Sequence, residues 1–367
     1  MTNRRLAASV ALRPMLFIVG RMTMMQRREA LATLGAAGMA MGLPGSAFAA
    51  PSTRKPPRLR PGDRVALVAP AGHYADPFDF QLVTEAVTAM GLVPIPGPHW
   101  KDRFGYLAGT DRDRAADLNA AFADRSIGAI LALRGGWGSQ RILPLLDWAT
   151  IRANPKLLVG FSDITALHLA IQARAGFPTI HGPTAGSGWS KYSYAAFRDL
   201  AFEGKLPVYQ NLPGDQDRLV QRQGRFQTVR PGKASGKLLG GNLTVLTALA
   251  GTPFLPDFSG AILFLEDTDE APYRIDRMLT QIGQAGILRK VAGVVFGQCT
   301  NCKPSDGSTS LFTLSEVFGQ HFGPLGVPVY TGAMFGHVDD QFSLPVGCRA
   351  EIDADAGTIR LLESPVA

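Results

Sequence analysis

Runs of apolar residues alternate with amphipathic stretches in the first half of the chain. Residues 64–70, 127–133 and 157–159 are mostly apolar, which is typical of strands buried on both faces of a sheet. Helical periodicity follows at about 79–90 and again after Thr110, a residue type that favours a helix N-cap. Alternating strands and helices predict a parallel sheet, with a site at the carboxyl ends of its strands.

The pattern changes in the second half. Strand-like runs lie at 236–242, 261–265 and 291–296, and a helical pattern follows the first of them. Two alternating segments, 350–353 and 358–361, flank a turn signal and predict a hairpin. We therefore expect this half to be mixed and rich in strands.

These patterns divide the chain into four parts. We predict an export segment at 1–50 and an α/β domain at 59–185, whose parallel sheet is flavodoxin-like. A stretch of mixed polarity with several prolines, 186–232, is expected to be a linker and surface segment. A mixed, β-rich domain follows at 233–363. At 367 residues, the chain is long enough for two domains with sizeable cores.

One turn carries a candidate nucleophile. Gly160 and Phe161 lead from the strand at 157–159 to Ser162, and Asp163 opens an apolar-periodic helix. A strand-turn-helix exposes the serine Oγ and places the next N–H at a helix N-terminus, where negative charge is stabilised. The motif lacks the second glycine of the usual G-x-S-x-G elbow. This segment alone therefore leaves Ser162 as either a nucleophile or a helix N-cap.

A carboxylate and a histidine further along the chain complete a candidate triad. Glu266 follows the apolar strand at 261–265, with Asp267 beside it, and His337 lies in a glycine-rich stretch. Serine, glutamate and histidine in this order can form a Ser-His-Glu hydrolase triad. Asp267 is the alternative carboxylate, and a solvated strand edge is the alternative interpretation of both acids.

Five separate segments of the chain form a recognisable set. They are Arg134-Gly135-Gly136-Trp137-Gly138-Ser139, Gly160-Phe161-Ser162-Asp163-Ile164-Thr165-Ala166-Leu167-His168, His181-Gly182-Pro183, Gly240-Gly241-Asn242-Leu243, and Leu265-Glu266-Asp267 with Tyr273-Arg274. Together they resemble the LD-carboxypeptidase family of serine peptidases, which includes murein tetrapeptide carboxypeptidases and microcin C self-immunity hydrolases. The resemblance runs from about residue 59 to about residue 362.

The resemblance implies a role for each candidate residue. Ser162 would be the nucleophile, Glu266 the acidic member and His337 the base. The backbone N–H groups of Asp163 and Gly136 would bind the developing oxyanion, because glycine lets a backbone N–H approach a carbonyl closely. No metal or other cofactor is implied.

The resemblance also implies a substrate. We expect a serine carboxypeptidase that removes D-alanine from murein tetrapeptides, with Arg134, Asn242 or Arg274 binding the terminal carboxylate. A hydrolase of peptidyl-nucleotides of the microcin C type is one alternative. A non-catalytic module that binds wall peptides or nucleotides, with Ser162 only a cap, is another. The chain lacks a G-x-G-x-x-G after its first strand, which argues against a dinucleotide site.

The net charge of +7 is concentrated at the N-terminus. Six arginines and one acid, Glu29, lie within the first 50 residues, so removing that segment leaves a net charge of +2. The remainder is therefore not basic enough to suggest a nucleic-acid partner.

The first 50 residues have the parts of a twin-arginine export signal. Arg27 and Arg28 precede a mildly apolar run at 30–43, too short and glycine-rich for a stable membrane span, and 47–49 supplies an A-x-A cleavage site. We therefore expect cleavage near Ala50 and a periplasmic mature protein. A Sec signal, an uncleaved amphipathic anchor, and a start at Met22, Met24 or Met25 are the alternatives.

Three cysteines remain to be explained. Cys299 and Cys302 form a lone C-x-x-C, and Cys348 is separate. No second pair and no histidine at zinc spacing accompanies them, so we expect either a structural disulfide or two inert thiols.

The sequence leaves the oligomeric state open, with a homodimer as one possibility.

Overall fold

The computed structural model describes residues 55–74, 76–214, 219–221, 224–304 and 312–367. The predicted export signal lies outside these residues, so it stays a prediction. None of the helices in the described part of the chain is long and apolar enough to span a bilayer.

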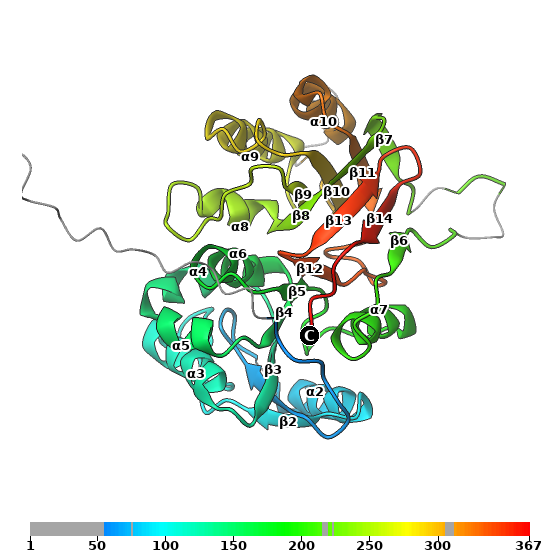
Figure 1. Ribbon diagram of the computed structural model, residues 1–367. Coiled ribbons are helices and arrows are strands. Elements are labelled where there is room, and N and C mark those ends of the chain that lie inside the picture. Colours follow the sequence, from blue (N-terminus) through cyan, green and yellow to red (C-terminus); the bar gives the residue numbers. More distant parts are fainter. Residues whose placement is uncertain (1–54, 75, 215–218, 222–223, 305–311) are drawn as a thin grey trace, which may run out of the picture. The chain divides into compact units, whose positions relative to one another are not determined.

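A six-stranded sheet carries the N-terminal half (Figure 1). Its strands are β1 (Arg64–Val68), β2 (Val93–Pro96), β3 (Ile127–Ala132), β4 (Leu157–Gly160), β5 (Thr179–His181) and β12 (Leu344–Val346). The order is β12-β5-β4-β3-β1-β2, with β1 to β5 parallel and β12 antiparallel to β5. The flavodoxin-like order 2-1-3-4-5 is thus confirmed.

Helices connect these strands. They are α2 (Pro77–Ala89), α3 (Asp111–Ala123), α4 (Ser139–Ile142), α5 (Trp148–Ala153), α6 (Thr165–Arg174) and α7 (Lys191–Ala201), with short 3-10 turns η1 (Leu143–Leu145) and η2 (Ser162–Ile164). The predicted cap is present, because Thr110 Oγ1 accepts a 3.2 Å hydrogen bond from the N–H of Asp113. The sequence pattern therefore placed the helix start correctly.

An eight-stranded mixed sheet carries the C-terminal half. Its strands are β6 (Val208–Gln210), β7 (Gln227–Arg230), β8 (Lys233–Asn242), β9 (Ile262–Thr268), β10 (Gly293–Thr300), β11 (Val329–Ala333), β13 (Arg349–Asp353) and β14 (Thr358–Leu361). The helices α8 (Leu243–Ala248), α9 (Pro272–Gln284) and α10 (Leu314–Phe322) and the turn η3 (Gly323–Leu325) accompany it. Strands β8 to β11 are parallel, and β13 with β14 forms the predicted hairpin.

The segment at 186–232 is more than the expected linker. It contains α7, which buries Phe197 and Leu200 on one face, and the strands β6 and β7. These strands close the two edges of the second sheet by pairing with β14 and β11. Short strands with few apolar residues give a weak local signal, because their pairing partners lie far away in the chain. The domain boundaries themselves stay a prediction.

The two sheets share one continuous core. Leu158 of β4, Ile164 of η2 and Phe264 of β9 are fully buried in the same hydrophobic cluster. The chain also crosses between the sheets, since β12 follows β11 of the second sheet and pairs with β5 of the first. Elements from both sheets can therefore hold one site in a fixed geometry.

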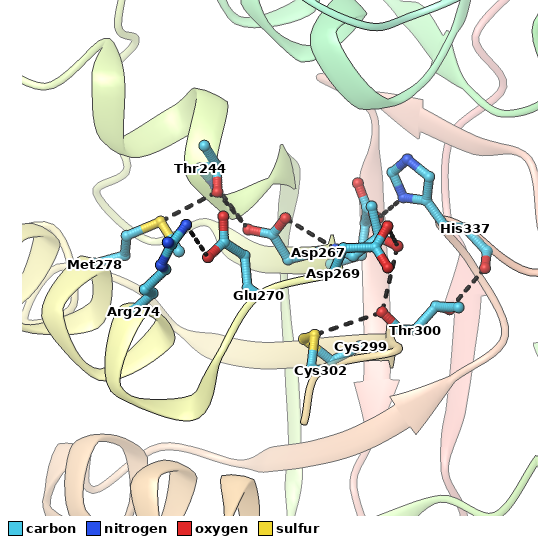
Figure 2. Close-up of a disulfide and its surroundings, with 12 residues drawn as sticks. Thr244, Asp267, Asp269, Glu270, Arg274, Met278, Cys299, Thr300, Cys302 and His337 are labelled. Atoms are coloured by element: carbon cyan, nitrogen blue, oxygen red, sulfur yellow. Dashed lines mark hydrogen bonds and ion pairs between the residues drawn. A yellow bond between two sulfur atoms is a disulfide. The ribbon is translucent and has the colours of Figure 1, made fainter. Parts of the chain in front are cut away.

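The end of β10 is closed by a disulfide between Cys299 and Cys302, whose Cα atoms are 5.4 Å apart (Figure 2). The structure therefore has the disulfide rather than two inert thiols at this pair. Cys348 is a free, buried thiol, and burial raises its pKa to about 12. It is protonated and unreactive at neutral pH.

Candidate active site

Ser162 lies at the turn between β4 and the helices that follow. Its φ is +62°, and among the described residues only Asp269 and Asn301 are other non-glycine positions with positive φ. This backbone region is costly for residues with a side chain and persists where surrounding structure imposes it. The strained strand-to-helix turn of a nucleophile elbow is thus present without the second glycine, whose place is taken by the buried Ile164.

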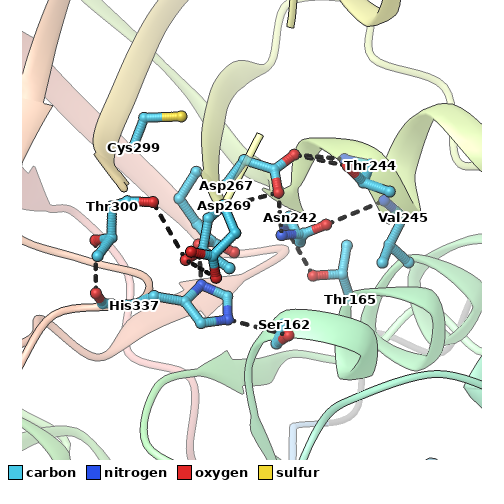
Figure 3. Close-up of polar contacts among 12 residues, drawn as sticks. Ser162, Thr165, Asn242, Thr244, Val245, Asp267, Asp269, Cys299, Thr300 and His337 are labelled. Carbon is cyan, nitrogen blue, oxygen red and sulfur yellow. Dashed lines mark hydrogen bonds and ion pairs between the residues drawn. The ribbon is translucent and has the colours of Figure 1, made fainter. Parts of the chain in front are cut away.

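Ser162 is joined to His337 and Glu266 by two hydrogen bonds. The Ser162 hydroxyl donates to His337 Nε2 at 3.2 Å (Figure 3), and His337 Nδ1 donates to Glu266 Oε2 at 2.8 Å. Both distances lie within the normal range for such bonds. The structure therefore brings all three predicted residues together, although 175 positions separate Ser162 from His337.

The surroundings of His337 favour its role as a proton acceptor. Burial lowers the pKa of its imidazole, but the hydrogen bond and charge of Glu266, together with the charges of Asp267 and Asp269, outweigh burial and raise the pKa above its usual value. Glu266 is fully buried, and the Phe161 ring packs edge-on against the imidazole with centroids 4.9 Å apart. These contacts hold the imidazole in one orientation.

Glu266 and Asp267 face different partners because successive strand residues point to opposite sides. Asp267 accepts bonds from the Asn242 amide at 3.1 Å and from the Thr244 N–H and hydroxyl at 3.0 and 2.8 Å. Burial and the charge of Glu266 raise the pKa of Asp267 to about 6. The structure therefore places Glu266 on His337 and Asp267 at the start of α8.

The predicted oxyanion donors lie on two turns that meet at Ser162. A Cβ built on Gly135 would lie 2.9 Å from the Ser162 Cβ and 3.0 Å from its Oγ, and 3.3 Å from the Asp163 nitrogen. Only glycine permits this approach. Gly136 is the next residue on the same turn, so the geometry is compatible with N–H groups from Gly136 and Asp163 converging beside Ser162. Their role as donors stays a prediction.

The Asp163 side chain fixes these two turns to each other. Its Oδ2 accepts bonds from the Ser139 N–H at 2.8 Å and from the Ser139 hydroxyl at 2.6 Å. Burial raises the pKa of this carboxyl, and the Ser139 bonds oppose that shift. The sequence analysis used Asp163 only for its N–H. A polar pair formed across 24 residues has no local pattern that would reveal it.

The three candidates for carboxylate binding have different surroundings. Arg134 is exposed beside the glycine turn, where Nη1 donates to the His73 carbonyl at 3.3 Å. Arg274 lies on α9, where it bonds to the Tyr273 hydroxyl and pairs with Glu270, which precedes the helix. Figure 2 shows Arg274 well apart from His337.

Asn242 is the N-cap of α8, with its Oδ1 bound by the Val245 N–H at 3.1 Å. Its Nδ2 donates to Asp267, and both contacts are drawn in Figure 3. The structure therefore gives Asn242 a structural task. A part in carboxylate binding stays a prediction for Asn242, as for Arg134 and Arg274.

A hollow of about 380 Å³ opens beside the triad. Phe161, Ser187, His337, Asp339 and Gln341 are among the residues that line it. Its size suits a few peptide residues, and its wall includes the imidazole that contacts Ser162.

One cluster within the described residues could hold a metal ion, at His99, Asp102 and Asp113. His99 Nδ1 already bonds to Asp102 at 2.8 Å, and the Thr110 hydroxyl donates to Asp113 at 2.6 Å. These internal bonds explain the cluster without an ion, and none of its members contacts the triad.

Comparison with known proteins identifies the family of the chain. Residues 65–182 match the LD-carboxypeptidase N-terminal domain, and residues 235–352 match the C-terminal domain of the same family. A Streptomyces coelicolor protein that carries a carboxypeptidase name is 42% identical over 313 residues, covering 84% of this chain and 96% of that protein. The chain belongs to the LD-carboxypeptidase family.

Other members of the LD-carboxypeptidase family are similar over most of their length. The murein tetrapeptide carboxypeptidase of Pseudomonas aeruginosa is 35% identical over 296 residues, which is 80% of this chain and 94% of that protein. The structure of the muramoyltetrapeptide carboxypeptidase from Oxalobacter formigenes matches with a TM-score of 0.70 and 31% identity, covering 81% of this chain and 97% of the other.

The microcin C7 self-immunity protein MccF of Escherichia coli also matches. Its structure in complex with glutamyl sulfamoyl guanosine gives a TM-score of 0.76 at 25% identity, over 85% of this chain and 99% of the other. The chain is therefore similar both to murein tetrapeptide carboxypeptidases and to a microcin self-immunity protein.

Proposed function

We propose that this protein is a serine-type LD-carboxypeptidase that removes the terminal D-alanine from murein tetrapeptides. The observation that carries the proposal is the hydrogen-bonded chain from Ser162 through His337 to the buried Glu266. Relatives named for murein peptides support the substrate, since one of them is 35% identical across 94% of its length.

The first step is attack on the last peptide bond. His337 Nε2 takes the proton of the Ser162 hydroxyl, and Oγ bonds to the carbonyl carbon. Glu266 holds Nδ1–H and stabilises the imidazolium that forms. The N–H groups of Gly136 and Asp163 receive the negative charge that develops on the carbonyl oxygen.

The second half of the reaction releases both products. His337 gives its proton to the departing amine, so D-alanine leaves and the shortened peptide stays as an ester on Ser162. Water then loses a proton to His337 while its oxygen bonds to the ester carbon. The bond from that carbon to Oγ breaks, and His337 returns the proton to Oγ, which restores the serine hydroxyl. One tetrapeptide and one water give one tripeptide and one D-alanine, with no metal or other cofactor taking part.

Recognition of a chain end needs a group that binds the free carboxylate. Arg134 is the strongest of the three candidates, because it is exposed and directly precedes Gly135, where an added Cβ would meet Ser162. The rest of the peptide would lie in the hollow that His337 and Phe161 line. The scissile bond would then lie between these two regions.

The proposal includes a cellular address and a process. The paired arginines and A-x-A site within residues 1–50 favour export to the periplasm, where murein peptides are released during remodelling or recycling. N-terminal sequencing of the mature protein would test this, with a start near Ala50 expected and an intact Met24 or Met25 arguing against it.

A peptidyl-nucleotide hydrolase is the second candidate. The MccF structure with a bound acyl sulfamoyl nucleoside, at a TM-score of 0.76, is the observation in its favour. The same triad could cleave such a bond, so the two functions differ only in what the cleft accepts.

Alanine release from defined peptides tests the proposal. A tetrapeptide ending in free D-alanine should be cleaved, while its C-terminal amide should have a kcat/KM about 10- to 100-fold lower, since one charge-assisted bond is lost. An all-L tetrapeptide should be a poor substrate. Equal rates for acid and amide would reject carboxylate recognition. Preferred cleavage of a peptidyl-nucleotide would transfer the assignment to the second candidate.

A further inference from the structure

Thr300, the last residue of β10, contacts the main chain of the base. Its hydroxyl donates to the carbonyl oxygen of His337 at 2.6 Å (Figure 3). This contact joins the end of β10 to the loop after β11, across 37 residues of chain. It fixes the backbone from which the imidazole projects.

The same residue is bound to the strand that carries the acid. The Thr300 carbonyl accepts the Asp269 N–H at 2.9 Å and the Thr268 hydroxyl at 3.3 Å, and Thr268 is its register partner on β9. Glu266 lies on that strand, two residues before Thr268. Thr300 therefore connects the backbones that carry Glu266 and His337.

The chain adopts the left-handed backbone region on both sides of this connection. Asp269 and Asn301, which follow Thr268 and Thr300, have φ values of +57° and +58°. Aspartate and asparagine tolerate this region better than other residues with a side chain, and such residues are typical of tight turns. The Cys299–Cys302 disulfide encloses Thr300 and Asn301 and is in place to hold this turn.

We propose that Thr300 is a positioning residue for the base, and that the Cys299–Cys302 disulfide holds the turn from which Thr300 reaches His337. The inference rests on the proposed function in taking His337 as the base. It adds a residue and a covalent bridge that lie outside the triad.

The geometry at His337 leaves little freedom for its backbone. A Cβ built on Gly336 would lie 2.5 Å from Glu266 Oε2, so the loop passes directly against the acid. The imidazole must at the same time reach Glu266 at 2.8 Å and Ser162 at 3.2 Å. A displacement of about 1 Å in such an arrangement can cost about 100-fold in rate.

Replacing the hydroxyl by a methyl group tests the contact. Thr300→Val should lower kcat by about 10- to 100-fold with little change in KM, and Thr300→Ser should restore most of the loss. Thr228→Val is the matched control, because its hydroxyl also donates to a backbone carbonyl, that of Ala354 at 2.7 Å. Thr228 pairs with Tyr330 near the start of β11, whereas Thr300 ends β10 and His337 follows the end of β11.

The second readout needs no substrate. Burial lowers the pKa of His337 and the charges of Glu266, Asp267 and Asp269 raise it, while His181 beside it stays neutral because burial lowers its own pKa. Loosening the contact with Glu266 should therefore lower the His337 pKa in an NMR titration of Thr300→Val. If the wild type released no D-alanine, the proposed function would fail, but this titration would still decide the role of Thr300.

Reduction of the disulfide is the third arm. Dithiothreitol supplies two electrons and two protons, becomes a cyclic disulfide, and leaves thiols at Cys299 and Cys302. In the reduced wild type, kcat and the pKa of His337 should both fall toward the values measured for Thr300→Val. Reduction should not lower the kcat or the His337 pKa of Thr300→Val any further. Dithiothreitol should also leave both quantities unchanged in the Cys299→Ser/Cys302→Ser variant.

Two results would overturn the role of Thr300, and a third would overturn that of the disulfide. Thr300→Val with wild-type kcat and an unshifted His337 titration would remove Thr300 from its role, as would a loss of activity with the titration unchanged. If Thr300→Val does not fold, the reduced wild type decides, and unchanged kcat and titration after confirmed release of both thiols would reject the bridge.

Discussion

Ser162 is held by a turn between neighbouring elements, whereas Glu266 and His337 are held by contacts between segments 71 residues apart. On the serine side, the geometry is set by backbone: a positive φ at Ser162 and the close approach of Gly135. On the acid and base side it is set by polar bonds that run from β9 through β10 to the loop after β11.

This difference predicts different sensitivities. On the serine side, an added methyl group at Gly135 should be costly because it meets Ser162 directly, and polar losses should matter only at the Asp163–Ser139 contact. On the acid and base side, the loss of a donor or acceptor should be costly, and so should an added side chain at Gly336, which lies against Glu266. Both sides must still act as one unit in the reaction.

The largest expected effect tests whether Ser162 and His337 act as one catalytic unit. Ser162→Ala and His337→Ala should each lower kcat by about 10⁶-fold, and the double variant should be no worse than either, because triad members are strongly non-additive. Steady-state kinetics on the three variants, with circular dichroism to verify folding, is the measurement. Additive losses would mean that the two sides act separately.

An added methyl group on the serine side comes next. Gly135→Ala would place a Cβ 2.9 Å from the Ser162 Cβ, so the elbow must shift and kcat should fall by about 10²- to 10³-fold. Gly319→Ala in α10 is the matched control, since a Cβ there meets nothing within 4 Å. Equal activity of the two variants would show that the approach at Gly135 is not limiting.

A polar change next to the acid should affect stability more than catalysis. Asn242→Ala removes the cap of α8 and a donor to Asp267, and should lower the free energy of unfolding by about 0.5–2 kcal/mol. The fold raises the pKa of Asp267 to about 6, which means that it favours the protonated carboxyl over the carboxylate. The free energy of unfolding therefore decreases as pH rises through that value.

The loss from Asn242→Ala should therefore be greater at pH 8 than at pH 5, because the missing donor served the charged form. Denaturant unfolding at both pH values is the measurement, with Asn242→Ser as the control that keeps the cap oxygen. A large rise in KM with unchanged stability would instead assign Asn242 to the substrate.

The smallest expected effect is a shift in the pH profile. His337 must be neutral to accept a proton, and its pKa is raised, so kcat/KM should fall as pH decreases through a midpoint above about 6.5, the ordinary histidine value. Asp269→Asn removes one of the charges that raise this pKa and keeps a residue type that tolerates positive φ.

The midpoint of Asp269→Asn should therefore lie slightly below that of the wild type, with kcat little changed and the difference reduced by salt. Profiles at low and high ionic strength measure it. An unshifted midpoint at low salt would remove Asp269 from the electrostatics of the base.

The two sides also differ in how far the sequence revealed them. The elbow could be predicted, because an apolar strand, a glycine and a periodic helix are adjacent in the chain and define Ser162 by local pattern. The parallel sheet of the first half followed from the same alternation, although β2 and β5 were not among the strands predicted. On the other side, the choice between Glu266 and Asp267 depended on which of two successive residues faces His337, and resemblance to a family rather than periodicity selected Glu266.

Other features had no local signal. The pairing of β12 with β5, the edge strands β6 and β7, and the contact of Thr300 with His337 all join residues far apart in the chain. Each short strand contributes only a few side chains, so long-range pairing decides its structure. For this reason the sequence did not reveal β6 and β7 within the segment expected to be a linker, 186–232.

Covalent labelling tests the central claim most directly. A fluorophosphonate reacts much faster with an activated serine than with an ordinary hydroxyl, and the mass of the modified peptide identifies the residue. We predict a single adduct on Ser162 in the wild type, and labelling at least about 100-fold slower in His337→Ala, as expected for loss of general-base assistance. An adduct on another residue, or equal labelling rates in the two proteins, would contradict the triad.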